Sequence, residues 1–210
     1  MTVKTAKFIR SYSSIEQMDN NPVPEFAFIG RSNVGKSSLI NALANHKGLA
    51  KISSKPGKTK LINQFLIDNV WHLIDLPGYG FAQVSKRDRD VFDEMITQYL
   101  LNRKELMTAF VLIDTRIEPQ PIDLEFVEWC GVNGVPFQLV FTKADKVKST
   151  ALAENTELFK AALYKQGWEV LPNSFITSSM KKTGIDEVLT FISKLNKTIK
   201  NVNKKLPKNS

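Results

Sequence analysis

Residues 30–37 carry glycines, a lysine and a serine at the spacing of a phosphate-binding loop. They read Gly-Arg-Ser-Asn-Val-Gly-Lys-Ser, which matches the pattern G-x-x-x-x-G-K-[ST]. An apolar run at 26–29 precedes the loop and a helix-like stretch follows from Ser37, so backbone N–H groups at the helix start would point at an anion. Lys36 would reach the outer phosphates, and the Ser37 hydroxyl would bind Mg²⁺. A chance glycine-rich turn is the alternative, but the context of strand, loop and helix favours binding of a nucleoside triphosphate.

A second motif bears on which base the protein recognises. An apolar, strand-like run ends in Thr142-Lys143-Ala144-Asp145, a Thr-Lys-x-Asp sequence. Guanine carries two neighbouring donors, its ring N1–H and its exocyclic amine, and one carboxylate can accept from both, whereas the N1 acceptor of adenine would repel it. Asp145 suits this role, with the aliphatic stem of Lys143 across the base plane. Alone, the motif is also typical of a solvated loop; after a phosphate loop it predicts guanine.

Between these motifs lie candidate contacts to the γ-phosphate and to Mg²⁺. Asp75 ends an apolar run and could hold a magnesium-bound water, while Gly78 lets its N–H approach a γ-phosphate closely. Loss of that phosphate would release the segment after Gly78. Thr59, in the lysine- and glycine-rich stretch 55–60, is the candidate for a second hydroxyl on Mg²⁺. Read alone, these are a Pro-Gly turn and an ordinary loop threonine; their position between the other two motifs favours the functional interpretation.

These motifs occur in the order and spacing of the translation-factor-related GTPases, and the chain resembles that class over about residues 5–197. The Pro-Gly-Lys-Thr stretch at 56–59 and the Asp-Leu-Pro-Gly-Tyr-Gly-Phe stretch at 75–81 look like those of the EngB (YihA/YsxC) family in particular. The resemblance implies a small bacterial GTPase that assists assembly of the large ribosomal subunit, in a family associated with normal cell division and septation. It also implies that residues 177–179 make the last guanine contact, through backbone N–H groups to the base carbonyl.

The motifs and the resemblance together define the candidate site. The expected nucleotide contacts are Gly30, Arg31, Ser32, Asn33, Val34, Gly35, Lys36, Ser37, Gly57, Lys58, Thr59, Lys60, Leu61, Asp75, Leu76, Pro77, Gly78, Thr142, Lys143, Ala144, Asp145, Thr177, Ser178 and Ser179. The residues expected to act in catalysis are Lys36, Asn33, Thr59 and Gly78. Mg²⁺ would be held by Ser37 and Thr59, and by Asp75 through a water molecule.

The residue after Gly78 bears on how hydrolysis would proceed. Many GTPases carry a Gln there that orients the attacking water. This chain has Tyr79, which lacks an amide and is expected to contribute little to hydrolysis. Asn33 resembles the Asn by which related GTPases hold K⁺, and a cation there would act as an arginine finger does. The alternative is that Asn33 only tolerates a tight-turn conformation, and both interpretations stay open.

Length and composition fit one globular domain in a reducing compartment. The chain has 210 residues, of which 42% are hydrophobic, and this suits a single α/β domain. Cys130 is the single cysteine; it lies in a predicted helix and is expected to be a small buried hydrophobe. Residues 1–7 lack the apolar core of a signal peptide, and no run approaches the roughly 18 apolar residues of a membrane span. We expect a cytoplasmic, monomeric protein without a membrane contact.

The apolar periodicity predicts alternating strands and helices. The expected strands are 5–12, 26–30, 61–68, 70–76, 108–114, 136–142 and 174–177, and the expected helices are 37–46, 87–103, 121–133, 149–166 and 184–198. The strands at 61–68 and 70–76 are too close for a crossover, so they should form an antiparallel hairpin. The sequence predicts an α/β fold: a P-loop NTPase of the Ras-like G-domain type, with a mostly parallel sheet, one antiparallel hairpin strand and helices on both faces.

The formal charge of +8 is concentrated in two segments. Residues 46–67 contain five lysines and no acid, and residues 180–210 contain eight lysines and two acids, so these segments carry +5 and +6. Residues 1–198 are expected to form one GTP-binding domain, with 199–210 as a basic, disordered tail. The tail lysines could serve solubility alone; contact with ribosomal RNA is what the resemblance implies.

Two functions from different classes remain open. The first is a slow GTPase switch, stimulated by K⁺ or by a ribosomal partner, that docks on the large ribosomal subunit or its precursor. The second is an RNA-binding ribosome scaffold in which the nucleotide is mainly structural. Tyr79 favours the scaffold, whereas the set of Lys36, Ser37, Thr59 and Asp75 favours the switch. A small-molecule kinase is disfavoured, because the chain has a Thr-Lys-x-Asp motif and no acceptor lid rich in arginine.

Overall fold

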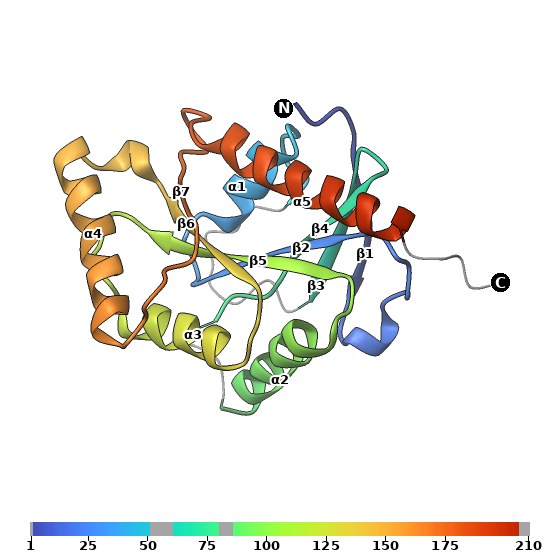
Figure 1. Ribbon diagram of the computed structural model, residues 1–210, viewed down its shortest axis with the longest axis horizontal. Helices are drawn as coiled ribbons and strands as arrows, with labels where there is room; N and C mark the ends of the chain where they lie inside the picture. Colours follow the sequence, from blue (N-terminus) through green and yellow to red (C-terminus); the bar gives the residue numbers. More distant parts are fainter. Residues whose placement is uncertain (1, 51–60, 80–85, 206–210) are drawn as a thin grey trace.

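The computed structural model describes residues 2–50, 61–79 and 86–205, with the backbone alone for 86–93 and 199–205 (Figure 1). The strands are β1 (Ala6–Tyr12), β2 (Glu25–Gly30), β3 (Ile62–Ile67), β4 (Trp71–Asp75), β5 (Leu106–Asp114), β6 (Phe137–Thr142) and β7 (Ser174–Ile176). The helices are α1 (Lys36–Leu43), α2 (Lys86–Asn102), α3 (Pro121–Val132), α4 (Ser149–Lys165) and α5 (Ile185–Lys205). Two short 3₁₀ helices are η1 (Ile15–Gln17) and η2 (Ala144–Lys146).

The strands form one sheet in the order β1-β3-β4-β2-β5-β6-β7. β3 is antiparallel to both of its neighbours, and the other pairings are parallel, so β3 alone runs against the rest. The turn between β3 and β4 has φ of 50° at Asp68 and 54° at Asn69. Two positive φ values match the right-handed twist of a tight hairpin, and Asp and Asn tolerate them. The predicted antiparallel hairpin and the mostly parallel sheet are therefore confirmed.

Side chains of the central strands alternate between two helical layers. In β2, Phe26 and Phe28 are buried against α1 and α5, whereas Ala27 and Ile29 are buried against α2, α3 and α4. A strand covered on both faces reads as a continuous apolar run. Figure 1 shows the same arrangement, with α1 and α5 on one side of the sheet and α2 and α3 on the other. The prediction of helices on both faces is confirmed.

Two helix ends differ from the predicted ones by more than one residue. α1 ends at Leu43 rather than at 46, and Asn45 just beyond it has φ of 46°. α5 continues to Lys205, seven residues past its predicted end, so the expected tail is helical for much of its length. Asn and Lys are tolerated in helices, and Pro207 is the first residue that forbids continuation. Residues 206–210 lie outside the described part of the chain. Within that part, no helix combines the length and apolar character needed to cross a membrane.

A buried polar cluster lies at the end of the sheet where β2 begins. The Glu25 carboxylate is 0% exposed and accepts hydrogen bonds from the Tyr99 hydroxyl (2.8 Å) and from Arg103 (2.8 and 3.0 Å). A buried carboxylate needs such partners, because an unpaired charge in the interior is costly. The cluster joins the start of β2 to Tyr99 in α2 and to Arg103 just after that helix. It lies at the end of β2 opposite to the one that carries the candidate site.

Candidate nucleotide-binding site

The predicted phosphate loop connects β2 to α1 and is held by residues at the end of β6. Thr142 donates its hydroxyl hydrogen to the Val34 carbonyl (2.6 Å), and Lys143 Nζ donates to the Asn33 carbonyl (2.5 Å). The C=O and N–H of one trans peptide point in opposite directions. The N–H of Gly35 therefore faces away from β6, as an anion-binding loop requires, whereas the N–H of Val34 donates within the loop to the Arg31 carbonyl (3.2 Å).

Both glycines of the loop are required. A Cβ at Gly30 would lie 2.9 Å from the Leu112 Cβ on β5, which is closer than carbon atoms pack. Gly35 has φ of 105°, a conformation that side chains disfavour, and a Cβ there would lie 3.5 Å from Lys143 Cε. The stem of Lys143 thus lies against Gly35, at the boundary between the phosphate loop and the predicted base site.

Lys36 and Asp75 meet where β2 and β4 end. Phe28 of β2 pairs in register with Asp75, and the Lys36 ammonium forms an ion pair with the Asp75 carboxylate. The two side chains are only 10% and 4% exposed. Asn63 on β3 donates a further hydrogen bond to Asp75 (3.2 Å). Ser37 follows in the first turn of α1. These groups meet at the C-terminal ends of the two strands. The ammonium suits a phosphate, and the carboxylate and hydroxyl oxygens suit Mg²⁺.

The segment that follows Asp75 is buried up to Tyr79. Leu76 donates its N–H to the Phe28 carbonyl (3.1 Å), and Pro77 and Gly78 are also buried. Tyr79 is 6% exposed, and its hydroxyl donates to Asp123 on α3 (2.9 Å). Burial, followed by the nearby Asp123, raises the pKa of this hydroxyl well above its ordinary value, so it stays a proton donor. Tyr79 therefore points into the core, in agreement with the prediction that it orients no water.

Asp145 lies in η2, a short 3₁₀ helix that sequence periodicity does not reveal. Its carboxylate accepts a hydrogen bond from the Ser178 hydroxyl (2.6 Å) and pairs with Lys146 (3.3 Å). The Ser178 hydrogen bond is the main reason why the pKa of Asp145 lies below its ordinary value. An ionised, oriented carboxylate is what bidentate recognition of guanine requires.

The resemblance implied that the backbone N–H groups of residues 177–179 contact the guanine carbonyl, but two of these three N–H groups are used within the fold. The N–H of Thr177 donates to the Phe141 carbonyl (2.7 Å), and that of Ser178 donates to the Thr183 carbonyl (3.0 Å). Those two donors are committed to the fold. Among the described residues, the N–H of Ser179 has no such partner, so it is the donor of the three that remains for a base carbonyl.

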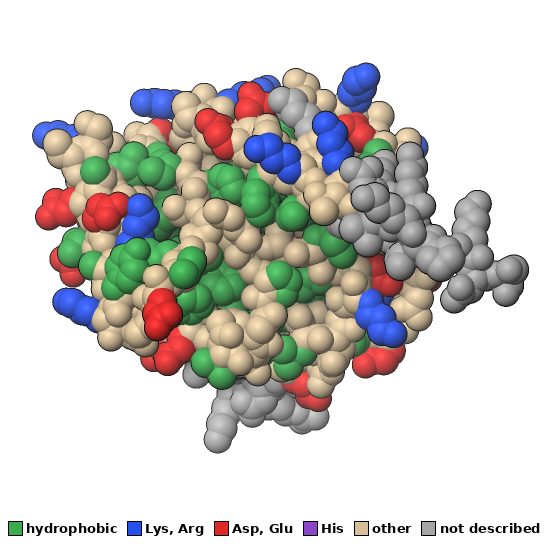
Figure 2. Space-filling model, in the orientation of Figure 1, with side chains coloured by type: hydrophobic (Ala, Val, Ile, Leu, Met, Phe, Trp, Pro, Cys, Tyr) green, Lys and Arg blue, Asp and Glu red, His purple; other side chains and the backbone are tan. Residues whose placement is uncertain are grey.

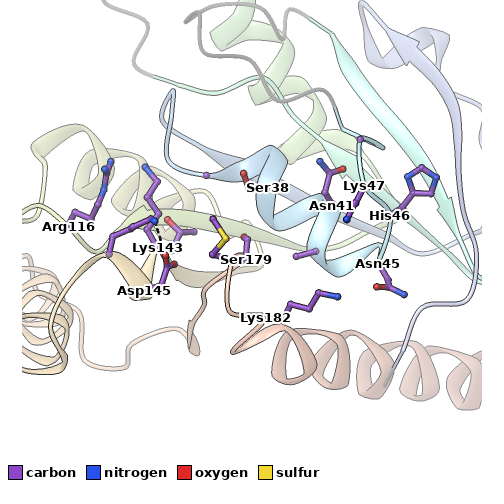
Figure 3. Close-up of a pocket in the computed structure, with 16 residues that line it drawn as sticks. Ser38, Asn41, Asn45, His46, Lys47, Arg116, Lys143, Asp145, Ser179 and Lys182 are labelled. Atoms are coloured by element: carbon purple, nitrogen blue, oxygen red, sulfur yellow. Dashed lines mark ion pairs between the residues drawn. The ribbon is translucent and has the colours of Figure 1, made fainter.

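A pocket of about 640 Å³ opens beside these residues (Figure 3). The predicted residues Gly35, Thr142, Lys143, Asp145 and Ser179 contribute to its wall. One side is formed by α1 and the loop after it, through Ser38, Asn41, Ala42, Asn45, His46, Lys47 and Gly48. Figure 3 shows Lys143 and Asp145 at one end of the pocket and Asn41 and His46 at the other. Ala144 and Thr177 do not line this pocket; the hydrogen bond from the Ala144 N–H to the Thr177 carbonyl (3.1 Å) joins the segment after β6 to the segment after β7.

Sequence reasoning missed an acid that orients Lys143. Asp114 ends β5, and its carboxylate accepts hydrogen bonds from Lys143 Nζ (2.7 Å) and Arg116 (2.8 Å). Although burial raises the pKa of Asp114, the hydrogen bonds from Arg116 and Lys143 hold it below its ordinary value. Arg116 also lines the pocket. The signal available in the sequence was Asp-Thr-Arg directly after the buried run 108–114.

Some predicted residues cannot be placed. Gly57, Lys58, Thr59 and Lys60 lie outside the described part of the chain, and Leu61, the first residue after them, is 39% exposed. Arg31 and Ser32 are half-buried in the phosphate loop. The structure thus brings together the phosphate loop, residues 75–78 and the Asp145 region, which come from three separate stretches of the chain.

The P-loop GTPases have this arrangement: a phosphate loop joins a central strand, here β2, to the helix that follows, here α1. A carboxylate suited to guanine, here Asp145, follows a later strand, here β6. The comparisons with known proteins agree with this class. Residues 25–143 match the family described as 50S ribosome-binding GTPase. A probable GTP-binding protein EngB from Christiangramia forsetii is 53% identical over 199 residues, covering 95% of this chain and all of that protein.

Solved structures give the same result. A crystal structure of a probable GTP-binding protein engB has a TM-score of 0.60 at 26% identity, with 83% of this chain and 99% of that one covered. Era in complex with MgGDPNP and nucleotides of 16S ribosomal RNA has a TM-score of 0.65 at 26% identity, covering 82% of this chain and 56% of that one. The chain belongs to the EngB family of GTP-binding proteins, and its activity is that of a GTPase.

Proposed function

We propose that this protein is a slow GTPase switch that binds the large ribosomal subunit or its precursor and assists its assembly, with normal cell division and septation depending on that step. The single observation that carries the proposal is the match of residues 25–143 to a 50S ribosome-binding GTPase family. Support also comes from Era, a structural neighbour whose complex contains ribosomal RNA. The protein is expected to act in the cytoplasm as a monomer.

Charge supports contact with RNA phosphates. The two basic segments, 46–67 and 180–210, carry +5 and +6. Figure 2 shows Lys and Arg side chains gathered along the upper edge of this face, where Figure 1 draws α5, with some acidic side chains between them. A polyanion is attracted to such an edge, and the attraction weakens as salt replaces the released counterions.

Magnesium is the cofactor that the family and the donor set favour. GTPases of this kind generally use Mg²⁺. Ser37 would bind it directly and Asp75 through a water molecule, while the second hydroxyl is proposed to come from Thr59. Bound Mg²⁺ neutralises charge on the β- and γ-phosphates. The protein's own part is to orient the triphosphate with loop N–H groups, Lys36 and the N–H of Gly78.

A test of the ribosomal role measures subunit binding and GTP turnover together. Isolated large subunits should stimulate GTP hydrolysis, and binding should weaken with salt by a slope that falls by about one for each phosphate contact removed. Replacing Lys204, Lys205 and Lys208 by Gln should lower subunit affinity and leave GTP binding intact. Substitution is preferable to deletion of 199–210, because α5 continues to Lys205.

The matched control replaces three lysines outside the basic segments, Lys104, Lys160 and Lys165, by Gln. It makes the same change in net charge and should leave the salt slope unchanged. Equal effects of the two triple variants would reduce the C-terminal lysines to a role in solubility. Subunit binding that ignores the bound nucleotide, with turnover unstimulated, would favour the scaffold function instead of the switch.

Potassium is the second proposed cofactor, with Asn33 as a ligand. Its φ of 62° also suits a residue chosen only for a tight turn. We expect K⁺ to accelerate GTP hydrolysis over Na⁺ at equal ionic strength, because a cation beside the phosphates stabilises developing charge. Asn33→Gly keeps the backbone conformation and removes the amide, so it should abolish the difference between the two ions while nucleotide affinity stays near normal.

Asn33→Ala is the companion variant, since it removes the amide and also disfavours the positive φ. If loss of the amide matters, both variants lose the K⁺ effect. If only the turn matters, Asn33→Gly behaves as wild type and Asn33→Ala alone is impaired. Equal wild-type rates in K⁺ and Na⁺, with and without large subunits, would return Asn33 to the role of a turn residue.

A further inference from the structure

Asp123 links the two loops that flank the predicted γ-phosphate position. It lies in the first turn of α3 and is 1% exposed. Both of its carboxylate oxygens lie 2.9 Å from Nε of Arg31, the second residue of the phosphate loop. The same carboxylate accepts the Tyr79 hydroxyl at 2.9 Å. One buried carboxylate thus contacts the residue next to Gly30 and the residue next to Gly78.

The position of Asp123 is itself well determined. Pro121 begins α3, so Asp123 sits near the helix N-terminus, where the helix dipole favours a carboxylate. Phe126, one turn later, stacks on the Tyr79 ring with centroids 4.4 Å apart. Ring and hydroxyl of Tyr79 are therefore both held by α3. Arg31 supplies the positive charge that a buried carboxylate needs.

Neither loop has a sheet ladder of its own to hold it. The N–H of Leu76 still bonds to β2, but Gly78 and Tyr79 follow beyond that point. A side chain fixed to α3 immediately after Gly78 restricts the peptide that joins the two residues. A side chain fixed to the same carboxylate immediately after Gly30 restricts the start of the phosphate loop. Asp123 thus adds a link between the far ends of the two loops, beside the Lys36–Asp75 ion pair at their other end.

We propose that Asp123 is a positioning residue for GTP hydrolysis, which acts through Tyr79 and Arg31 to hold Gly78 against the phosphate loop. The inference rests on the proposed placement of the γ-phosphate beside Gly78. Catalysis by oriented backbone donors depends on geometry, and small displacements are costly. GDP lacks the γ-phosphate, so its affinity should not depend on the hydrogen bond from Tyr79 to Asp123, which acts on Gly78. Tyr79 thus contributes to hydrolysis after all, by orienting the backbone rather than water.

The test compares Tyr79→Phe, Asp123→Ala and the double variant in single-turnover GTP hydrolysis and in GDP binding. Tyr79→Phe keeps the ring against Phe126 and removes only the hydroxyl contact. It should lower the hydrolysis rate about fivefold or more and leave the GDP Kd within about twofold. The double variant should be no slower than Asp123→Ala, because the contact is already lost there.

Tyr99→Phe is the matched control, since it removes another buried hydroxyl from a carboxylate, at the end of the sheet where β2 begins. It should cost similar thermal stability and leave the hydrolysis rate unchanged. Cys130 reports the integrity of α3: burial raises the pKa of its thiol to about 12, so a thiol reagent should label it only when the helix opens. Rapid labelling of Cys130 in Asp123→Ala would mean that α3 has opened in this variant. The hydrolysis rate of Tyr79→Phe then decides the test by itself.

Tyr79→Phe with the wild-type rate, and a stability loss equal to that of Tyr99→Phe, would overturn the inference and make the contact purely structural. Failure of the proposed function looks different. In that case wild type itself would not be stimulated by large subunits, whereas the contrast between Tyr79→Phe and Tyr99→Phe in intrinsic turnover would persist.

Discussion

Asp145→Asn should lose most of its affinity for GTP and GDP and gain affinity for xanthine nucleotides. The substitution replaces one acceptor oxygen by an amide donor that faces the guanine amine. Loss of a charge-assisted bidentate pair costs about 2–5 kcal/mol, which corresponds to a roughly 30- to several-thousand-fold rise in Kd. Xanthine carries a carbonyl in place of that amine and would accept from the new donor. Titration calorimetry with GDP and XDP measures both effects.

Glu154→Gln is the control for this substitution, because it neutralises an exposed carboxylate on α4 and should change neither affinity. The Ser178 hydrogen bond keeps the pKa of Asp145 below its ordinary value, so wild-type affinity should stay flat from neutral pH down to about pH 5. Guanine affinity retained in Asp145→Asn would show that the carboxylate does not read the base.

Lys36→Ala should abolish tight binding of both GTP and GDP and also lower the thermal stability of the protein. The lysine is expected to contact the β- and γ-phosphates, and loss of a buried charge contact of this kind costs about 2–5 kcal/mol, or a roughly 30- to several-thousand-fold change in Kd. The second effect follows from the ion pair with Asp75: among the described residues, the variant leaves this 4% exposed carboxylate with Asn63 as its remaining side-chain partner. Nucleotide titration and thermal unfolding separate the two effects.

Lys165→Ala removes an exposed lysine at the end of α4 and should alter neither property. A Lys36→Ala protein that binds GDP as wild type does would remove the lysine from the phosphate site. Unchanged stability would instead show that Asp75 finds another partner when Lys36 is absent.

The regular elements could be predicted because their signals are local. Apolar runs such as 26–29 and 109–113 are continuous since helices cover both sides of those strands. The sequence Asp68-Asn69 between two such runs indicated the hairpin, and positive φ at both residues is the reason. The phosphate loop could be predicted because its motif lies within eight consecutive residues, although the packing that requires Gly30 involves Leu112 on β5.

The contacts that orient the site could not be predicted, because they join distant residues. Asp114 and Lys143 are 29 residues apart, and Arg31 and Asp123 are 92 apart. A single sequence contains no pattern that pairs such residues. The length of α5 was underestimated for a different reason: its last turns have little apolar content, so periodicity ends before the helix does.

The hairpin of β3 and β4 has an entropic consequence. Asn63 is paired with Asp75, so the chain that arrives at β3 and the chain that leaves β4 meet the sheet side by side. The proposed Thr59 and Gly78 are thus each only a few residues from a common pair of hydrogen-bonded strands. The conformational entropy lost on bringing two points of a chain together is smaller when the free segment between them is shorter. Bringing both residues to one phosphate therefore costs little conformational entropy. Folding of the β3–β4 hairpin has already brought the start of β3 next to the end of β4.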